Sequence, residues 1–298
     1  MTPIVVSPKA DADVNDMLQR LFDLGGPAVA RKYAQQLEAI YERLAIFPAS
    51  GARRKSLGAR MIDALDHLEI AGSVGAYETL LGRRAVNGRL QTSNVGLTFR
   101  AGGDGLSSMV FATSDLDKAA QLLARRAVPS NRQGDRLILS RGATHGVPIE
   151  LCECRDRAMP SPLAGSDEAA AISALDHIVV RTPNPERAIA FYAGRLGLDL
   201  RLDRSNPDWG SRLLFFRCGD LVVEIAHDLK KGVSDRPDHL WGLSWRTPDI
   251  TKANARLKAA GIDVSEPRDG RRPGSQVFTV KNHTEGVPTL VIGGIGRW

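Results

Sequence analysis

The chain has 298 residues, of which 43% are hydrophobic and 25% are charged. These fractions exclude a wholly disordered or fibrous protein, and the length predicts about two domains. No apolar run reaches the roughly 18 residues of a membrane-spanning helix, and the first residues lack the pattern of a signal peptide. The net charge of +6 is modest, and the short basic clusters carry no interleaved aromatic residues. We therefore expect a cytoplasmic protein without membrane or nucleic-acid partners.

Residues 1–60 are expected to be mostly helical. Apolar residues recur with helical spacing over 14–22 and again over 29–44. Gly25, Gly26 and Pro27 lie between these two stretches and are expected to end one helix and start the next. A helical hairpin is therefore predicted, preceded by a short strand at 4–6.

From about residue 61 the pattern changes to short β-like runs that alternate with helical segments, and the same order of parts occurs twice. Ile62–His67 matches Ile172–His177, 110 residues later, and Gly146–Pro148 matches Gly286–Pro288, 140 residues later. Each copy is predicted to hold two βαβββ modules.

The repeat sets the predicted domain boundaries. The first copy covers 61–154 and the second covers 172–298. Residues 155–171 are rich in Pro, Ser, Ala and acidic residues and are expected to form the linker.

The second copy has the clearer local signals. Asn184 followed by Pro185 is a favourable helix start, and Gly261 is expected to end a helix over 250–260. Strands are predicted at 212–217, 221–226, 240–246, 276–280 and 289–292.

A tandem βαβββ layout with Leu-Asp-His on the first strand of each copy resembles the vicinal oxygen chelate superfamily. That superfamily includes glyoxalase I, extradiol dioxygenases, methylmalonyl-CoA epimerase, and bleomycin and fosfomycin resistance proteins. The strongest stretch is Leu175–Leu198, with the sequence LDHIVVRTPNPERAIAFYAGRLGL. The resemblance covers residues 62–293 and implies an α+β fold of two glyoxalase-like domains. It does not specify the reaction, because one scaffold hosts many chemistries.

Residues 1–60 separately resemble the first part of ParE/RelE-type toxins. The resemblance is carried by Ser7–Ala10 and by Leu44–Arg54. In that family a small sheet should follow the helices, but here the repeat begins at about residue 61 instead. The alternative is a helical hairpin that packs on the rest of the protein, forms a homodimer or binds a protein partner.

The superfamily resemblance implies a cup that closes around a divalent metal, with Mn, Fe, Ni, Co or Zn as candidates. In that family the ligands are His, Glu or Gln on the first, fourth, fifth and eighth strands of a four-module set. In order, the matching residues of the first copy are His67, Thr98, Ser107 and Glu150, and those of the second copy are His177, Glu224, Trp241 and Leu290. His239 precedes Trp241 by two residues, so on a regular strand it would share a face with it.

Two cup arrangements follow from this uneven set. If the copies exchange parts, His177 and Glu224 meet Glu150 and Ser107. If each copy closes on itself, the second offers His177, Glu224 and His239, and the first offers only His67 and Glu150. Either arrangement predicts at most one competent metal site, and His177 and Glu224 belong to it in both.

Two functions are therefore expected as alternatives. The first is a metal-dependent isomerase, lyase or dioxygenase that acts on a small oxygenated substrate, with Glu224 or Glu150 as a general base when no metal takes part. The second is a metal-free binding protein of the bleomycin-resistance type, in which Trp241, Trp209 and Ser107 line the cup. The alternatives are purely structural roles: hydrogen-bonded core histidines at His177 and His67, and packing of both tryptophans. The sequence contains no phosphate loop, dinucleotide fingerprint or nucleophilic-serine elbow.

Overall fold

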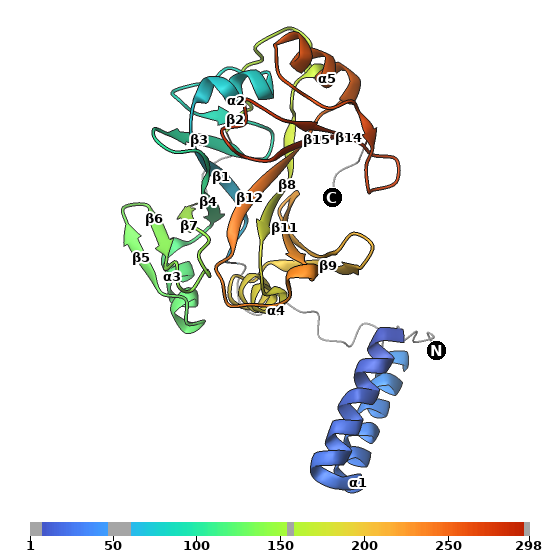
Figure 1. Ribbon diagram of the computed structural model, residues 1–298. Helices are drawn as coiled ribbons and strands as arrows, with labels where there is room; N and C mark the ends of the chain where they lie inside the picture. Colours follow the sequence, from blue (N-terminus) through green and yellow to red (C-terminus); the bar gives the residue numbers. More distant parts are fainter. Residues whose placement is uncertain (1–7, 47–60, 154–157, 295–298) are drawn as a thin grey trace. The chain divides into compact units, whose positions relative to one another are not determined.

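The computed structural model describes residues 8–46, 61–153 and 158–294 (Figure 1). The chain divides into two compact units, Met1–Ala59 and Arg60–Trp298. The strand predicted at 4–6 and part of the predicted linker, 154–157, lie outside the described residues.

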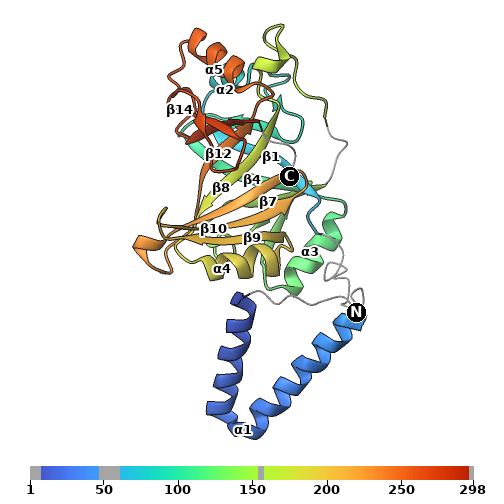
Figure 2. The same ribbon diagram turned by 90° about the vertical axis from the view of Figure 1, so that its right-hand side faces the viewer.

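The first unit is the predicted helical hairpin. Helix α1 (Pro8–Ile46) is interrupted at Gly26, whose φ of 78° and ψ of 176° are not helical. The left-handed φ suits glycine, and Pro27 starts the second arm, which Figure 2 shows folded back from the first. None of the described side chains of this helix is buried, and Phe22 and Leu24 are 48% and 90% exposed. The toxin-like character and the protein partner of this unit stay predictions.

The second unit contains two mixed sheets, one from each copy of the repeat. The first sheet has seven strands in the order β2-β3-β1-β4-β7-β6-β5. Its elements are β1 (Ala64–Ala71), α2 (Val74–Leu81), β2 (Leu90–Gln91), β3 (Gly96–Arg100), β4 (Gly105–Thr113), α3 (Leu116–Arg125), β5 (Ser130–Gln133), β6 (Arg136–Leu139) and β7 (Ile149–Glu153).

The second sheet has eight strands in the order β13-β14-β15-β12-β8-β11-β10-β9. Its elements are β8 (Ala174–Arg181), α4 (Pro185–Ile189), a π-helical turn (Ala190–Arg195), β9 (Asp199–Asn206), β10 (Ser211–Cys218), β11 (Leu221–Asp228), β12 (His239–Arg246), α5 (Ile250–Ala259), β13 (Arg268–Asp269), β14 (Gln276–Val280) and β15 (Thr289–Gly293). Short 3₁₀ turns lie at Glu168–Ala170 and Leu229–Lys231.

The predicted helix signals act as expected. The side chain of Asn184 accepts a hydrogen bond from the backbone N–H of Arg187, and Pro185 is the first residue of α4. Gly261 adopts a φ of 77° directly after α5, a conformation that an L-residue with a side chain rarely takes.

Strand pairing shows how the modules combine. In each sheet the two modules of one copy join through an antiparallel pair, β1 with β4 and β8 with β12. Both modules of each cup therefore come from one copy, and His177 and Glu224 lie in a different sheet from Glu150. The first sheet has fewer strands because, among the described residues, its first module has no counterpart of β9.

Each sheet buries one face and opens the other. In the second sheet Ile178, Val180, Val223 and Trp245 are fully buried on the face covered by α4 and α5. Full burial of such side chains stabilises the fold by roughly 1.5–3 kcal/mol each. Period-two alternation sends their neighbours, among them His177 and Glu224, to the opposite face, which is only partly covered and forms the cup.

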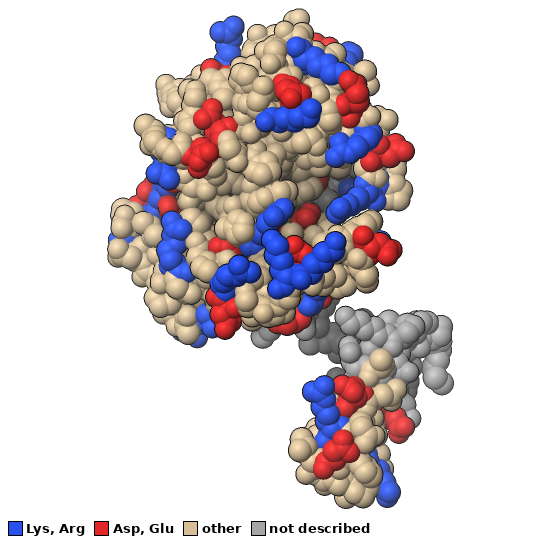
Figure 3. Space-filling model, in the orientation of Figure 1, with Lys and Arg blue, Asp and Glu red and all other residues tan. Residues whose placement is uncertain are grey.

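Figure 3 shows side chains of both signs of charge scattered over the described part of one face of this unit, with a group of Lys and Arg side chains below its centre. Within the described part of the chain, no helix is both long enough and apolar enough to span a membrane.

Candidate active site

The Leu-Asp-His motif of each copy contains a β-bulge. In the pairing of β8 with β12, Leu175 lies opposite Trp245 and His177 opposite Ser244, so Asp176 is the extra residue of the bulge. A bulge re-aims the side chain of its extra residue. Here it turns the carboxylate of Asp176 toward the ring of the next residue, with 2.9 Å between Oδ2 and Nδ1 of His177.

The first copy repeats this local geometry. Asp66 is bulged between Leu65 and His67 in the pairing of β1 with β4, and its Oδ2 lies 2.6 Å from Nδ1 of His67. Each Asp also binds an arginine, Arg89 at 3.2 Å in the first copy and Arg246 at 3.0 Å in the second. The motif thus fixes each histidine ring so that its Nε2 faces the cup.

In the second cup the ring of His177 faces a carboxylate. Its Nε2 lies 3.5 Å from Oε2 of Glu224, which comes from the neighbouring strand β11. Burial opposes the charged ring, but the hydrogen bond to Asp176 and the negative charge of Glu224 outweigh it and raise the pKa of His177 above its ordinary value. The side chain of Asp176 is 1% exposed and that of Glu224 is 14% exposed. The series Asp176–His177–Glu224 is therefore shielded from water at Asp176 and reaches the cup at Glu224.

The strand register places the remaining expected ligands of this cup. Leu290 is paired with Ser244, which in turn is paired with His177, so Leu290 lies two strands from the histidine, and Ser244 stands between them. His239 is paired with Arg181, four residues or about 13 Å along β8 from His177. The expectation that His239 joins His177 and Glu224 is therefore wrong. Burial and the charge of Arg181 lower the pKa of His239.

The second cup supplies two residues that fit a metal as ligands. A separation near 3.4 Å is what two ligands about 2.1 Å from one tetrahedral ion would have, close to the 3.5 Å between Nε2 of His177 and Oε2 of Glu224. Ser244 adds a buried hydroxyl without a hydrogen-bond partner. Among the residues that the structure describes, however, no three His, Cys, Asp or Glu side chains converge as ligands. His177 and Glu224 are fewer than the three protein ligands of a catalytic metal site.

In the first cup a guanidinium stands between the acidic groups. Arg136, from β6, has its Nη1 2.9 Å from Oε1 of Glu69 and 2.8 Å from Oε2 of Glu150. Its Nη2 lies 3.3 Å from Nε2 of His67. Burial opposes the charge of Arg136, but its hydrogen bonds to Glu150 and Glu69 keep its pKa above the ordinary value. The two expected metal ligands of this copy, His67 and Glu150, are thus both occupied by a cation of the chain itself.

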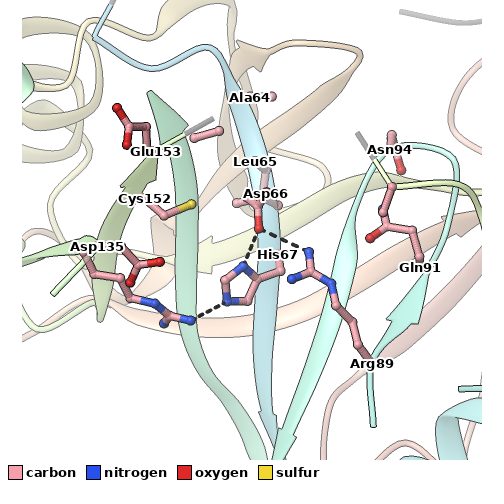
Figure 4. A pocket seen from close by; sticks show the side chains of 13 residues that line it. Ala64, Leu65, Asp66, His67, Arg89, Gln91, Asn94, Asp135, Cys152 and Glu153 are labelled. Atoms are coloured by element: carbon pink, nitrogen blue, oxygen red, sulfur yellow. Dashed lines mark hydrogen bonds and ion pairs between the residues drawn. The ribbon is translucent and has the colours of Figure 1, made fainter. Parts of the chain in front are cut away.

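Two cavities lie in the first copy, and this arginine lines the larger of them. That cavity, of about 520 Å³, is lined by Asp66, His67, Arg89 and Arg136, and Figure 4 shows the His67 ring joined to the Asp66 carboxylate. A second, of about 300 Å³, is lined by Glu69, Glu150, Ser107 and Ser108. Ser107 accepts a hydrogen bond from Arg100 at 2.8 Å.

The two expected cup tryptophans belong to the second copy. Trp241 lies at a bulge in β12, where Arg181 covers its ring at 4.0 Å. Trp209, in the turn between β9 and β10, is 40% exposed and is flanked by Arg204 and Arg271. Neither packs in the core.

Several residues of both cups were missed from the sequence. Glu69 carried a usable signal, because it stands two residues after His67 and so shares its face. Asp66 and Asp176 are part of the motif, but only the bulge brings their carboxylates to the rings. Arg136 carried no signal, since its contact depends on which strands become neighbours.

Comparison with known proteins finds relatives of part of the chain. Residues 174–286 match the model of the Glyoxalase/Bleomycin resistance protein/Dioxygenase superfamily. The ethylmalonyl-CoA/methylmalonyl-CoA epimerase of Cereibacter sphaeroides is 28% identical over 109 residues, which are 33% of this chain and 81% of the epimerase.

Two solved structures resemble a larger part of the chain. A halotolerant catechol dioxygenase has a TM-score of 0.58 at 13% identity, covering 80% of this chain and 88% of its own. A catechol 2,3-dioxygenase has a TM-score of 0.57 at 18% identity, covering 80% and 94%. At this identity the likeness concerns the fold, and the predicted α+β fold of two glyoxalase-like domains is confirmed.

Proposed function

We propose, with the superfamily domain at residues 174–286 as the premise, that the second cup catalyses proton transfer at a carbon next to a carbonyl group of a small oxygenated substrate. This is chemistry of the isomerase or lyase type. The observation that carries the proposal is the hydrogen-bonded and ion-paired chain from Asp176 through His177 to Glu224. The epimerase relative supports the same reaction type.

Each group has a distinct task in this proposal. The Glu224 carboxylate accepts the proton as the C–H bond breaks, and the electron pair of that bond moves into the carbonyl to form an enolate. His177, whose pKa is raised by the hydrogen bond to Asp176 and the charge of Glu224, offers in its charged form its Nε2 proton to the developing oxygen charge. Asp176 holds the ring in place and Arg246 balances the buried Asp176 charge. Return of the proton from Glu224 restores the substrate, whereas delivery of a proton to the opposite face of the carbon inverts it.

Hydrogen–deuterium exchange tests the reaction without assuming a product. Methylmalonyl-CoA and ethylmalonyl-CoA are incubated with the protein in D₂O, and deuterium at the acidic carbon is followed by mass spectrometry. We expect exchange with the unaltered protein, and at least a 100-fold loss in Glu224→Gln and His177→Gln, since general acid–base groups contribute about 10²–10⁴ in rate. Glu150→Gln, a matched change in the first cup, should retain full exchange. Exchange that survives Glu224→Gln would contradict the assignment.

A separate experiment tests whether the reaction depends on a metal. The same assay is run after chelation and after addition of Mn, Fe, Ni, Co or Zn. Because only two protein ligands converge, we expect exchange to persist after chelation. Exchange that disappears on chelation and returns with one of these ions would replace the present proposal by a metal-dependent one.

A metal-free binding protein is the second candidate. It is favoured by the apolar Leu290 at an expected ligand position and by the guanidinium of Arg136 in the first cup. In that case the acyl thioesters would bind without deuterium exchange.

A further inference from the structure

We propose that a cluster of arginines and tryptophans at the mouth of the second cup binds a phosphate group of the substrate. The rim cluster consists of Arg181, Arg204, Trp209, Trp241 and Arg271. The inference deepens the proposed function and rests on it for placing the reactive carbon at Glu224. It assigns the substrate to phosphate-bearing molecules.

Strand register puts two of these arginines on the cup face. Arg181 is level with Ala226, Ala226 with Leu213, and Leu213 with Arg204, across four neighbouring strands. Residues that lie level in a sheet point to the same side, which is the side of Glu224, two residues before Ala226. The rim row is therefore about 7 Å along the strand from Glu224 and about 13 Å from His177.

The third arginine arrives from the opposite edge of the sheet. Arg271 lies in the loop between β13 and β14, whereas Trp209 lies in the turn between β9 and β10. These strands stand at opposite ends of the strand order, yet the Arg271 guanidinium lies 4.4 Å from the centre of the Trp209 ring. The sheet is thus curled until its two edges meet across the cup, and Trp209 sits between Arg271 and Arg204, which is 5.0 Å away.

The rim arginines carry uncompensated charge. Among the described residues no carboxylate forms an ion pair with Arg181, Arg204 or Arg271, whereas many other arginines of this domain are paired. Asp203, next to Arg204 in the chain, is held by Arg212 at 2.7 Å. Three unpaired positive charges at one opening favour an anionic ligand.

The chemistry of the cluster favours phosphate over a single carboxylate. A guanidinium stacked on an indole ring is held in place while its N–H edge stays available for bidentate bonds to oxygen anions. Several such groups around one opening match the several oxygens and multiple charge of a phosphate ester or diphosphate. The apolar Leu213 lies between them and offers no competing hydrogen bond.

Calorimetric titration tests the site separately from catalysis. The probes are inorganic phosphate, inorganic diphosphate, ADP and coenzyme A without an acyl group, with malonate as the carboxylate probe. We expect ADP and coenzyme A to bind, and malonate at least tenfold more weakly. If inorganic diphosphate binds as tightly as coenzyme A, the phosphate groups alone supply the affinity. If inorganic diphosphate binds more weakly than coenzyme A, the site also recognises the nucleoside.

Variants of the rim decide which residues act. Arg204→Ala combined with Arg271→Ala should weaken ADP binding at least tenfold, since a hydrogen bond to a charged group is worth about that factor or more. Arg201→Ala is the matched control, because Arg201 lies on the same strand and is already paired with Asp199. It should change binding less than twofold. If the double variant unfolds at a lower temperature than the native protein, Arg271→Ala alone, in an exposed loop, is used in its place.

The outcomes separate this proposal from the proposed function. Glu224→Gln should abolish deuterium exchange and still bind ADP. The rim proposal is overturned if no phosphate probe binds, if malonate binds equally well, or if Arg201→Ala weakens binding as much as the rim variant. Rim binding without any exchange would instead overturn only the catalytic proposal.

Discussion

Replacing Arg136 by Met removes the cation from the first cup while keeping an unbranched apolar side chain. In the native structure one nitrogen, Nη1, contacts Glu69 at 2.9 Å and Glu150 at 2.8 Å. Their carboxylate oxygens are therefore within about 6 Å of each other, which at an effective dielectric constant of about 20 corresponds to roughly 3 kcal/mol of repulsion once the guanidinium is gone.

The exposure of these groups sets the expected loss of stability. The side chains of Arg136, Glu69 and Glu150 are 32%, 26% and 16% exposed, between the limits of a surface pair and a buried one. We expect Arg136→Met to lower the free energy of unfolding by about 2–3 kcal/mol at pH 7.5. For a unit of this size the melting temperature should fall by about 5–10 °C.

One condition should reverse this loss if the reasoning holds. Added Mn²⁺ or Zn²⁺ should raise the melting temperature of the variant and leave the native protein unchanged, because an ion can then take the place of the guanidinium.

Differential scanning calorimetry measures these effects. Arg132→Met is the matched control on the neighbouring strand, where Arg132 forms an exposed ion pair with Asp117 and should contribute under 1 kcal/mol. The reasoning is refuted if Arg136→Met melts with the native protein at pH 7.5, or if the divalent ions stabilise both proteins equally.

Two further predictions concern the Asp–His pairs. Because the pKa of His177 is raised in the folded state, its contribution to stability is present at low pH and is lost as the pH rises through that pKa. His177→Gln should therefore destabilise the protein more at pH 6 than at pH 9, as measured by urea titration. An equal loss at both pH values would show that Asp176 and Glu224 do not hold the proton. A Cβ on Gly96 would lie 2.3 Å from Nη2 of Arg89, so Gly96→Ala should displace that arginine and cost about 1–2 kcal/mol by thermal melting, but little in an Arg89→Met background.

The elements of the second copy could be predicted because their signals are local. Asn184 and Pro185 start a helix whatever surrounds them, and Gly261 ends one through its own backbone preference. The strand Leu221–Asp228 was recognisable as an apolar run, and a carboxylate inside it marked Glu224 as unusual. Such features depend on a few consecutive residues, which the sequence displays directly.

The failures come from register and from strand order. His239 was grouped with His177 by counting along one strand, but the pairing of β12 with β8 sets it opposite Arg181 instead. Arg136 reaches Glu69 because β6, β7, β4 and β1 are successive neighbours, an order that no short stretch of sequence encodes. Contacts of this kind depend on long-range pairing, where a shift of one residue changes every facing side chain.

The two cups diverge at the outer nitrogen of the same histidine. Both rings have Nδ1 beside the carboxylate of a bulged Asp that is itself paired with an arginine. At Nε2, His67 meets the guanidinium of Arg136 at 3.3 Å, which occupies that nitrogen. His177 meets Glu224 instead, so its ring in the charged form can donate at both nitrogens. The second cup therefore places a proton donor beside a carboxylate, as proton transfer at carbon requires.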